Sequence, residues 1–145
     1  MRSIDGFLFD VQTWAEGQDD LEAILLVGSY ARNQARYDSD IDLVLLTHQP
    51  NKYVSDSSFA SNFGSIMDAR EEDWGRVTSK RIWFRVGFEV EFGITTPDWI
   101  TEEPLDAGTV RVIRDGARVL FDRIGHLEEL VTSVRSAADA GNDDD

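Results

Sequence analysis

The chain has 145 residues, enough for one domain with a buried core and little more. Its 28 acidic and 14 basic residues give a net charge of −14, which disfavours a long nucleic acid as partner because Lys and Arg supply most affinity for phosphate backbones. Cysteine is absent, so disulfides and thiolate metal sites are excluded, and no apolar run approaches membrane-spanning length. We expect a cytoplasmic protein with a single domain at 1–140 and an acidic tail at 141–145.

The first predicted elements are a helix and a strand. Asp10 is suited to cap a helix over residues 11–16, and Gly17 is suited to end it. A continuous apolar stretch follows at 21–27 and predicts a buried strand. This strand sets the position of the next segment.

A tight turn at Gly28-Ser29 follows the strand, and a short helix is predicted at 31–36. The backbone N–H groups of the turn and of the helix start would face one side, where they can bind a phosphate, and Ser29 adds a hydroxyl. Arg32 would lie in the first turn of this helix. It can reach a phosphate or pair with a nearby acid, and the sequence favours neither.

Two aspartates lie on the next predicted strand. Ile41, Leu43 and Leu45 alternate with Asp40 and Asp42, and this period of two places both carboxylates on one face of the strand. Carboxylate oxygens so placed are ligands that Mg²⁺ or Mn²⁺ prefers.

The order GSYAR, seven residues and DID resembles the signature of the DNA polymerase β superfamily of nucleotidyltransferases. Members hold two Mg²⁺ ions on three strand carboxylates and transfer a nucleoside monophosphate from a triphosphate to a hydroxyl. The resemblance implies an α/β (α+β) fold in which helices pack on a small mixed β-sheet. It assigns phosphate binding to Gly28 and Ser29, and metal binding to Asp40 and Asp42.

The third carboxylate that the resemblance requires is expected in the second strand of a pair at 77–85 and 87–94. Glu89 and Glu91 share one face of that strand. We assign the role to Glu91 because Gly93 follows on the same face and leaves room for a ligand. Glu89 is the alternative third carboxylate. The competing explanation is that this face of the strand is solvated and that both glutamates are ordinary surface residues.

Three basic residues also lie in this strand pair. One of Lys80, Arg81 and Arg85 could neutralise a triphosphate, although exposed basic residues on strands are the commoner case. The tryptophans are expected to be core or half-buried side chains. They are Trp14, Trp74, Trp83 and Trp99.

The other predicted elements complete a mixed pattern of helices and strands. They are a connection at 47–64 with a helical turn at 57–62, a short helix or turn beginning at 97–99, a helix at 108–114, a strand at 118–121, and a terminal amphipathic helix through Leu127, Leu130, Val131 and Val134 that ends near Gly141.

The expected function is metal-dependent transfer of a nucleoside monophosphate, AMP from ATP, to a hydroxyl, with Asp40, Asp42 and Glu91 as catalytic metal ligands and Gly28, Ser29 and Arg32 around the nucleotide. Mg²⁺ or Mn²⁺ is the expected cofactor. The alternative is a minimal nucleotide-binding module that acts with a partner protein, as in toxin–antitoxin pairs of the superfamily.

A partner is also suggested by apolar strand residues. Ile82, Phe84, Phe88 and Phe92 offer apolar area that a single layer of helices would leave partly open. A homodimer or a small helical partner could cover it, and relatives usually bind their acceptors with an additional helical domain. A monomer covered by its own terminal helix is the competing explanation.

Overall fold

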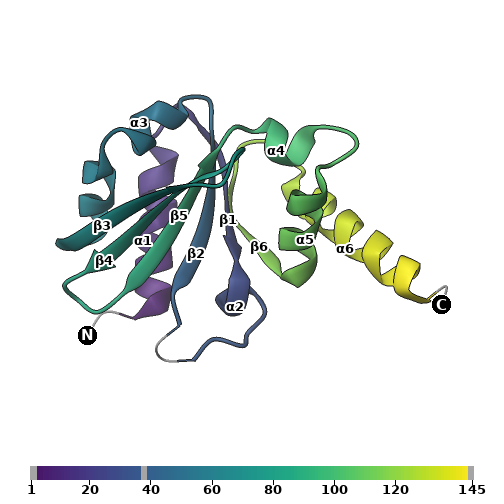
Figure 1. The fold of residues 1–145 in the computed structure, drawn as a ribbon, viewed down its shortest axis with the longest axis horizontal. Helices are drawn as coiled ribbons and strands as arrows, with labels where there is room; N and C mark the ends of the chain where they lie inside the picture. Colours follow the sequence, from purple (N-terminus) through teal and green to yellow (C-terminus); the bar gives the residue numbers. More distant parts are fainter. Residues whose placement is uncertain (1–2, 37–38, 144–145) are drawn as a thin grey trace.

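The computed structural model describes residues 3–36 and 39–143 and has the mixed α/β architecture that the sequence predicts (Figure 1). A six-stranded sheet forms its centre, with helices packed on it. The elements are α1 (Ile4–Glu16), β1 (Leu21–Val27), α2 (Gly28–Ala31), β2 (Ile41–Thr47), α3 (Pro50–Val54), the 3₁₀ helix η1 (Ser57–Phe63), β3 (Ile66–Asp73), β4 (Thr78–Phe84), β5 (Glu89–Thr95), α4 (Asp98–Thr101), α5 (Ala107–Asp115), β6 (Ala117–Asp122) and α6 (Leu127–Asp143).

The strands lie in the order β3-β4-β5-β2-β1-β6. All neighbouring pairs are antiparallel except β2 and β5, which run parallel. In this parallel pair Asp42 is in register with Glu91, and on the next strand Arg81 is in register with Glu91. The topology therefore brings together residues that are far apart in the sequence.

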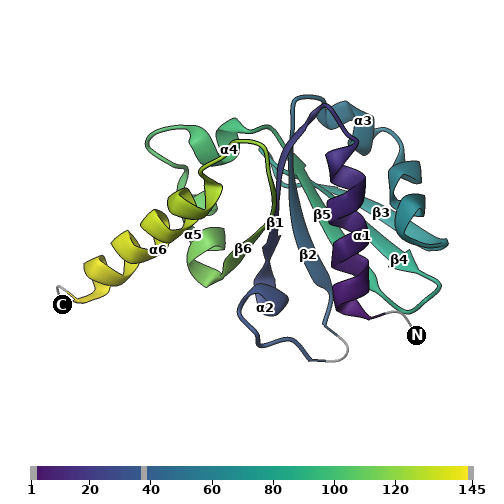
Figure 2. The same ribbon diagram turned by 180° about the vertical axis from the view of Figure 1, so that it is seen from behind.

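One face of the sheet is covered by α1, α3 and η1, and α1 lies in front of the strands in Figure 2. Phe7 and Val11 of α1 pack there against Leu43 and Phe92, all of which are buried. Alternate residues of the strands supply this core, as the period of two requires.

The opposite face is only partly covered by helices. Over β1, β2 and β6 it packs against α4, α5 and α6, with Leu25, Val44 and Ile113 in the buried cluster. Over β4 and β5 the same face carries part-buried polar residues, among them Arg81 and Glu91. The carboxylates lie where the helical cover ends.

Two helices differ from the sequence predictions. The first begins at Ile4 rather than at residue 11, because Ser3 is its N-cap and its Oγ accepts a hydrogen bond of 3.0 Å from the Gly6 N–H. The helix predicted at 31–36 is wrong, since α2 ends at Ala31 and Arg32 is its C-cap. Gly28 has φ +75°, so the chain turns from β1 directly into the helix.

Three further features differ from the sequence predictions: strand β3, the exposure of Trp74 and the C-terminal end of α6. The sequence does not predict strand β3, because nearly all of its side chains are exposed and it lacks alternating apolar residues. Trp74 is 66% exposed rather than part of the core. Helix α6 continues through Gly141 to Asp143, and residues 144–145 of the predicted acidic tail lie outside the described residues.

The apolar strand residues that suggested a partner are covered by the chain itself. Ile82, Phe84 and Phe92 are at most 2% exposed, and Phe88 is only partly buried but packs against Phe7. Phe63 of η1 stacks on Phe92, so the cover comes from the α1 and η1 side of the sheet. The argument for a partner from these residues is therefore wrong. No helix in the described ranges is long and apolar enough to cross a membrane.

Candidate active site

Gly28 directly follows β1, and its Cα faces the carboxylate of Asp42. Val27 and Asp42 are paired across β1 and β2, so the turn that follows β1 lies against the start of β2. A Cβ atom on Gly28 would lie 2.3 Å from Asp42 Oδ2. Only glycine combines this contact with the positive φ, which explains the residue at the start of α2.

Three carboxylates meet beside this turn. Asp40 directly precedes β2, Asp42 is the second residue of β2, and Glu91 lies opposite on β5. Each contributes one oxygen to a group whose members all lie within 4.8 Å of one another, and all three residues are half-buried. The structure thus brings together the residues that the sequence proposed as metal ligands, and their role remains a prediction.

Arg81 of β4 is the positive charge in this group of acids. Its Nη1 donates to Asp40 Oδ2 at 3.0 Å and to Glu89 Oε2 at 2.5 Å, and its Nη2 donates to Glu91 Oε2 at 2.7 Å. Its side chain is 28% exposed, so solvent screens these ion pairs only partly. Arg81 therefore occupies the position of a cation among the carboxylates.

The electrostatics of Asp42 favour a further positive charge. Burial raises the pKa of Asp42 to about 7, and the neighbouring charges of Asp40 and Glu91 contribute to the rise, while Arg81 opposes it. A carboxyl held in this way gains from a bound cation. Three hard oxygen donors of this kind suit Mg²⁺ or Mn²⁺, so the residues fit a divalent metal.

Glu89 and Glu91 have different surroundings. Glu89 accepts a hydrogen bond of 2.7 Å from Trp83 Nε1 in addition to its contact with Arg81. Glu91 accepts a hydrogen bond of 2.9 Å from Ser79 Oγ and also belongs to the carboxylate group. The geometry therefore favours Glu91 as the third ligand and gives Glu89 a supporting position.

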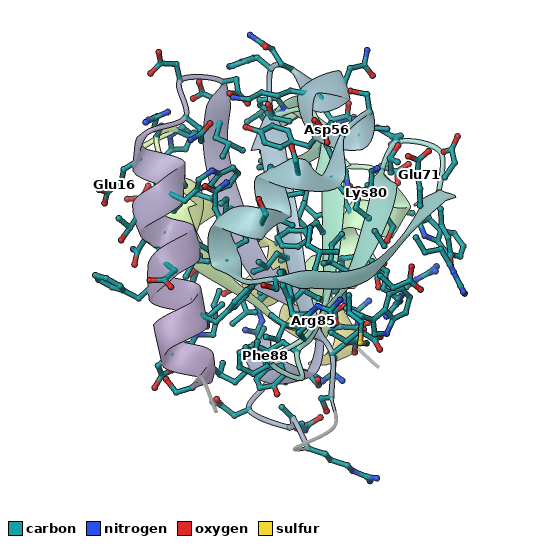
Figure 3. All side chains as sticks on the ribbon, turned by 90° about the vertical axis from the view of Figure 1, so that its left-hand side faces the viewer. Glu16, Asp56, Glu71, Lys80, Arg85 and Phe88 are labelled. Atoms are coloured by element: carbon teal, nitrogen blue, oxygen red, sulfur yellow. The ribbon has the colours of Figure 1, made fainter. Side chains whose placement is uncertain are left out.

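The other predicted basic residues lie outside this group. Arg32 is exposed, and its Nε donates to Gln34 Oε1 at 3.2 Å. Lys80 points to the opposite face of the sheet, where its Nζ donates to Ser57 Oγ and pairs with Glu71. Figure 3 labels Lys80 and Glu71. Arg85 is exposed in the turn between β4 and β5.

A groove of about 800 Å³ begins at Asp42 and Glu91 and extends over β2 and β5. Helix α5 lines one side with Thr109, and the turn between β3 and β4 lines the other with Trp74. Neither residue is predictable as part of the site, because its place there depends on how α5 and this turn pack on the sheet. We call this feature the β2–β5 groove.

A glycine-serine turn beside paired strand carboxylates, on a mixed sheet of this topology, defines the nucleotidyltransferase class. The family model of streptomycin adenylyltransferases matches residues 1–93, and the chain belongs to this family. Its sequence matches no curated protein.

The fold is shared with a solved adenyltransferase structure. An aminoglycoside 6-adenyltransferase from Bacillus subtilis is similar with a TM-score of 0.56 at 13% identity, over 68% of this chain and 37% of that one. A weaker similarity is to the structure of Cid1 with the UTP analogue UMPNPP, with a TM-score of 0.45 at 16% identity, over 63% and 31% of the two chains. The present chain thus spans little more than a third of the length of the adenyltransferase.

Proposed function

We propose that this chain transfers AMP from ATP to a hydroxyl of a cationic, polyhydroxylated acceptor of the aminoglycoside kind, with Mg²⁺ or Mn²⁺ as cofactor. The convergence of Asp40, Asp42 and Glu91 beside the turn at Gly28 carries this proposal. The family match supports adenylyl transfer over the alternative of a module that only binds a nucleotide.

The metal would be held by Asp40, Asp42 and Glu91, and it would supply charge stabilisation for the phosphoryl oxygens. Gly28 and Ser29 would hold the β- and γ-phosphates, because the absence of a Cβ atom at Gly28 lets this turn lie directly beside the carboxylate of Asp42. In the described part of the chain, no capping side chain hydrogen-bonds to the N–H groups at the start of α2.

The reaction joins the acceptor oxygen to the α-phosphorus and breaks the bond between that phosphorus and the oxygen bridging to the β-phosphate. Pyrophosphate leaves, and the proton of the acceptor hydroxyl passes to a carboxylate, for which Glu91 is placed by Ser79 Oγ. Positioning and charge stabilisation are the contributions of the protein.

The charge of the chain supports a cationic acceptor. Its net charge is −14, and Asp40, Glu89 and Glu91 gather around Arg81 at the open side of the site. An acidic opening raises the local concentration of cationic molecules.

The proposal is tested by incubating the protein with ATP labelled in the α-phosphate, Mg²⁺ and a panel of aminoglycosides that includes streptomycin. Label should move to an acceptor with release of pyrophosphate, and Asp42→Asn should abolish both. Absence of transfer to every aminoglycoside, under conditions where the protein binds a nucleotide with Mg²⁺, would reject this acceptor class.

A further inference from the structure

The β2–β5 groove is an apolar feature attached to a strongly polar site. Its inner end is formed by Asp42 and Glu91, and its volume of about 800 Å³ is typical of sites for small molecules. Its apolar lining includes Val27, Val44, Val77, Trp99 and Val112. A molecule bound at the carboxylates can therefore extend into apolar surroundings.

Gly93 keeps the floor of this groove open. It lies two residues after Glu91 on the same face of β5, and it lines the groove. A Cβ atom there would lie 3.1 Å from Val77 Cγ1, which is closer than ordinary van der Waals contact. A larger residue would fill the space next to the carboxylates.

Thr109 provides a polar group that the protein itself does not satisfy. The residue lines the groove from α5 and is 1% exposed. Its Oγ1 has no hydrogen-bond partner within the described part of the chain, although a helical threonine can usually bond to a carbonyl one turn earlier. Buried hydroxyls without partners are rare and destabilising, so the unpaired Thr109 hydroxyl indicates a group that a bound ligand can satisfy.

We infer that the β2–β5 groove binds the nucleoside half of the nucleotide, and that Thr109 Oγ1 hydrogen-bonds its base or ribose. This inference rests on the proposed function. A flat base needs apolar walls and few polar contacts, which is what the groove offers. Trp74, 66% exposed at its edge, adds an aromatic surface on which a base can stack.

The chemistry of the groove fits the acceptor poorly. A cationic acceptor with many hydroxyls needs several acidic partners. The acids that line the groove are Asp42 and Glu91 at its inner end, where the metal and phosphates would bind, and Asp106, which already caps α5 by accepting the Gly108 N–H. Asp40 and Glu89, the other acids near the site, lie around Arg81. Arg76, the basic residue that lines the groove, is already paired with Glu102 and Asp98. The nucleoside is therefore the better occupant.

The test uses calorimetric titration of α,β-methylene-ATP with Mg²⁺ into four proteins: wild type, Thr109→Val, Thr109→Ser and Thr132→Val. Tripolyphosphate with Mg²⁺ is titrated in parallel, because it probes the phosphate site without a nucleoside. Thr132 is an exposed threonine of α6. Its substitution controls for replacing a threonine hydroxyl by a methyl group outside the groove.

Thr109→Val should weaken the binding of the nucleotide analogue by roughly threefold to tenfold, the value of one hydrogen bond, and should leave tripolyphosphate binding unchanged. Its melting temperature should equal or exceed that of the wild type, because an unsatisfied hydroxyl is removed. Thr109→Ser and Thr132→Val should bind like the wild type.

Unchanged binding of the analogue by a folded Thr109→Val protein, or an equal loss for tripolyphosphate, would overturn the inference and leave the proposed function standing. A wild-type protein that binds neither probe with Mg²⁺ would overturn the proposed function, and the inference with it.

Discussion

A Cβ atom on Gly28 would lie 2.3 Å from Oδ2 of Asp42. The turn after β1 therefore packs directly against the carboxylate of Asp42 and leaves no room for a side chain at residue 28. The contact joins the turn proposed to bind phosphate to a residue proposed to bind the metal. Any side chain at Gly28 must move Asp42 or the start of α2.

Gly28→Ala should therefore reduce stability by more than the backbone strain of about 1–3 kcal/mol that a residue with positive φ suffers. It should also abolish stabilisation by Mg²⁺. Gly87→Ala is the matched control, because Gly87 has φ +100° and a Cβ atom added there would have no neighbour within 4 Å. Thermal melts of both variants with and without Mg²⁺ measure the difference, and equal behaviour would show that the Asp42 contact is unimportant.

Arg81 should stabilise the metal-free protein. Removing it leaves Asp40, Glu89 and Glu91 close together without their cation, and unpaired half-buried charges are destabilising. Arg81→Gln should lower the melting temperature in EDTA and increase the rise on adding Mg²⁺.

The control for this variant is Arg85→Gln, which removes an exposed arginine from the nearby turn, visible in Figure 3. It should have little effect with or without metal. An Arg81→Gln protein that melts like Arg85→Gln under both conditions would contradict the role of Arg81 as a substitute cation.

The raised pKa of Asp42 predicts the pH dependence of stability. The folded pKa is about 7 and the ordinary value is 3.8, so the folded state binds the proton more tightly than the unfolded state. The resulting stability is present at acid pH and is lost as the pH rises through 7.

The measurement compares the wild type with Asp42→Asn in EDTA from about pH 5 to pH 8. The variant should gain stability relative to the wild type over this range, because it has no carboxyl to ionise. Mg²⁺ should reduce the gain by favouring the ionised form of the wild type. A difference that stays constant with pH would exclude the raised pKa.

The two glutamates of β5 should differ in their effect on metal binding. Glu91 belongs to the carboxylate group, whereas Glu89 is held by Trp83 and Arg81. Glu91→Gln should weaken Mn²⁺ binding by more than about tenfold, since losing a supporting partner alone can cost that much. Glu89→Gln should cost less. Titration of Mn²⁺ by electron paramagnetic resonance decides, and a larger loss for Glu89→Gln would move the third ligand to that residue.

Buried strands are predictable because their apolar residues either form a continuous run, as in β1, or alternate with a period of two, as in β5. The strand predicted at 21–27 matches β1. The strands predicted at 77–85 and 87–94 contain β4 and all but the last residue of β5. Strand β3 is not predictable, since its exposed residues carry no such pattern. The short helix after Gly28 is misplaced in the prediction because its start depends on the glycine's φ of +75°.

Asp40 and Asp42 are predicted from the motif spacing, and Glu91 from the alternation of its strand and the position of Gly93, but their surroundings are not predictable. Arg81 meets Glu91 only because β4 and β5 pair in the observed register. Thr109 lines the groove because α5 packs beside β1 and β2, a long-range relationship that no local pattern encodes. Local sequence therefore indicates which groups carry the chemistry, and tertiary packing determines what they contact.

The parallel pairing of β2 with β5 has a consequence for how the site forms during folding. Asp42 and Glu91 meet only after the intervening chain, which includes α3, η1, β3 and β4, has closed on itself. Closing so long a loop is slow, and the unfolded chain has no preformed cluster of ligands. A divalent metal should therefore act chiefly on the native state, so that it slows unfolding and leaves the rate of folding nearly unchanged.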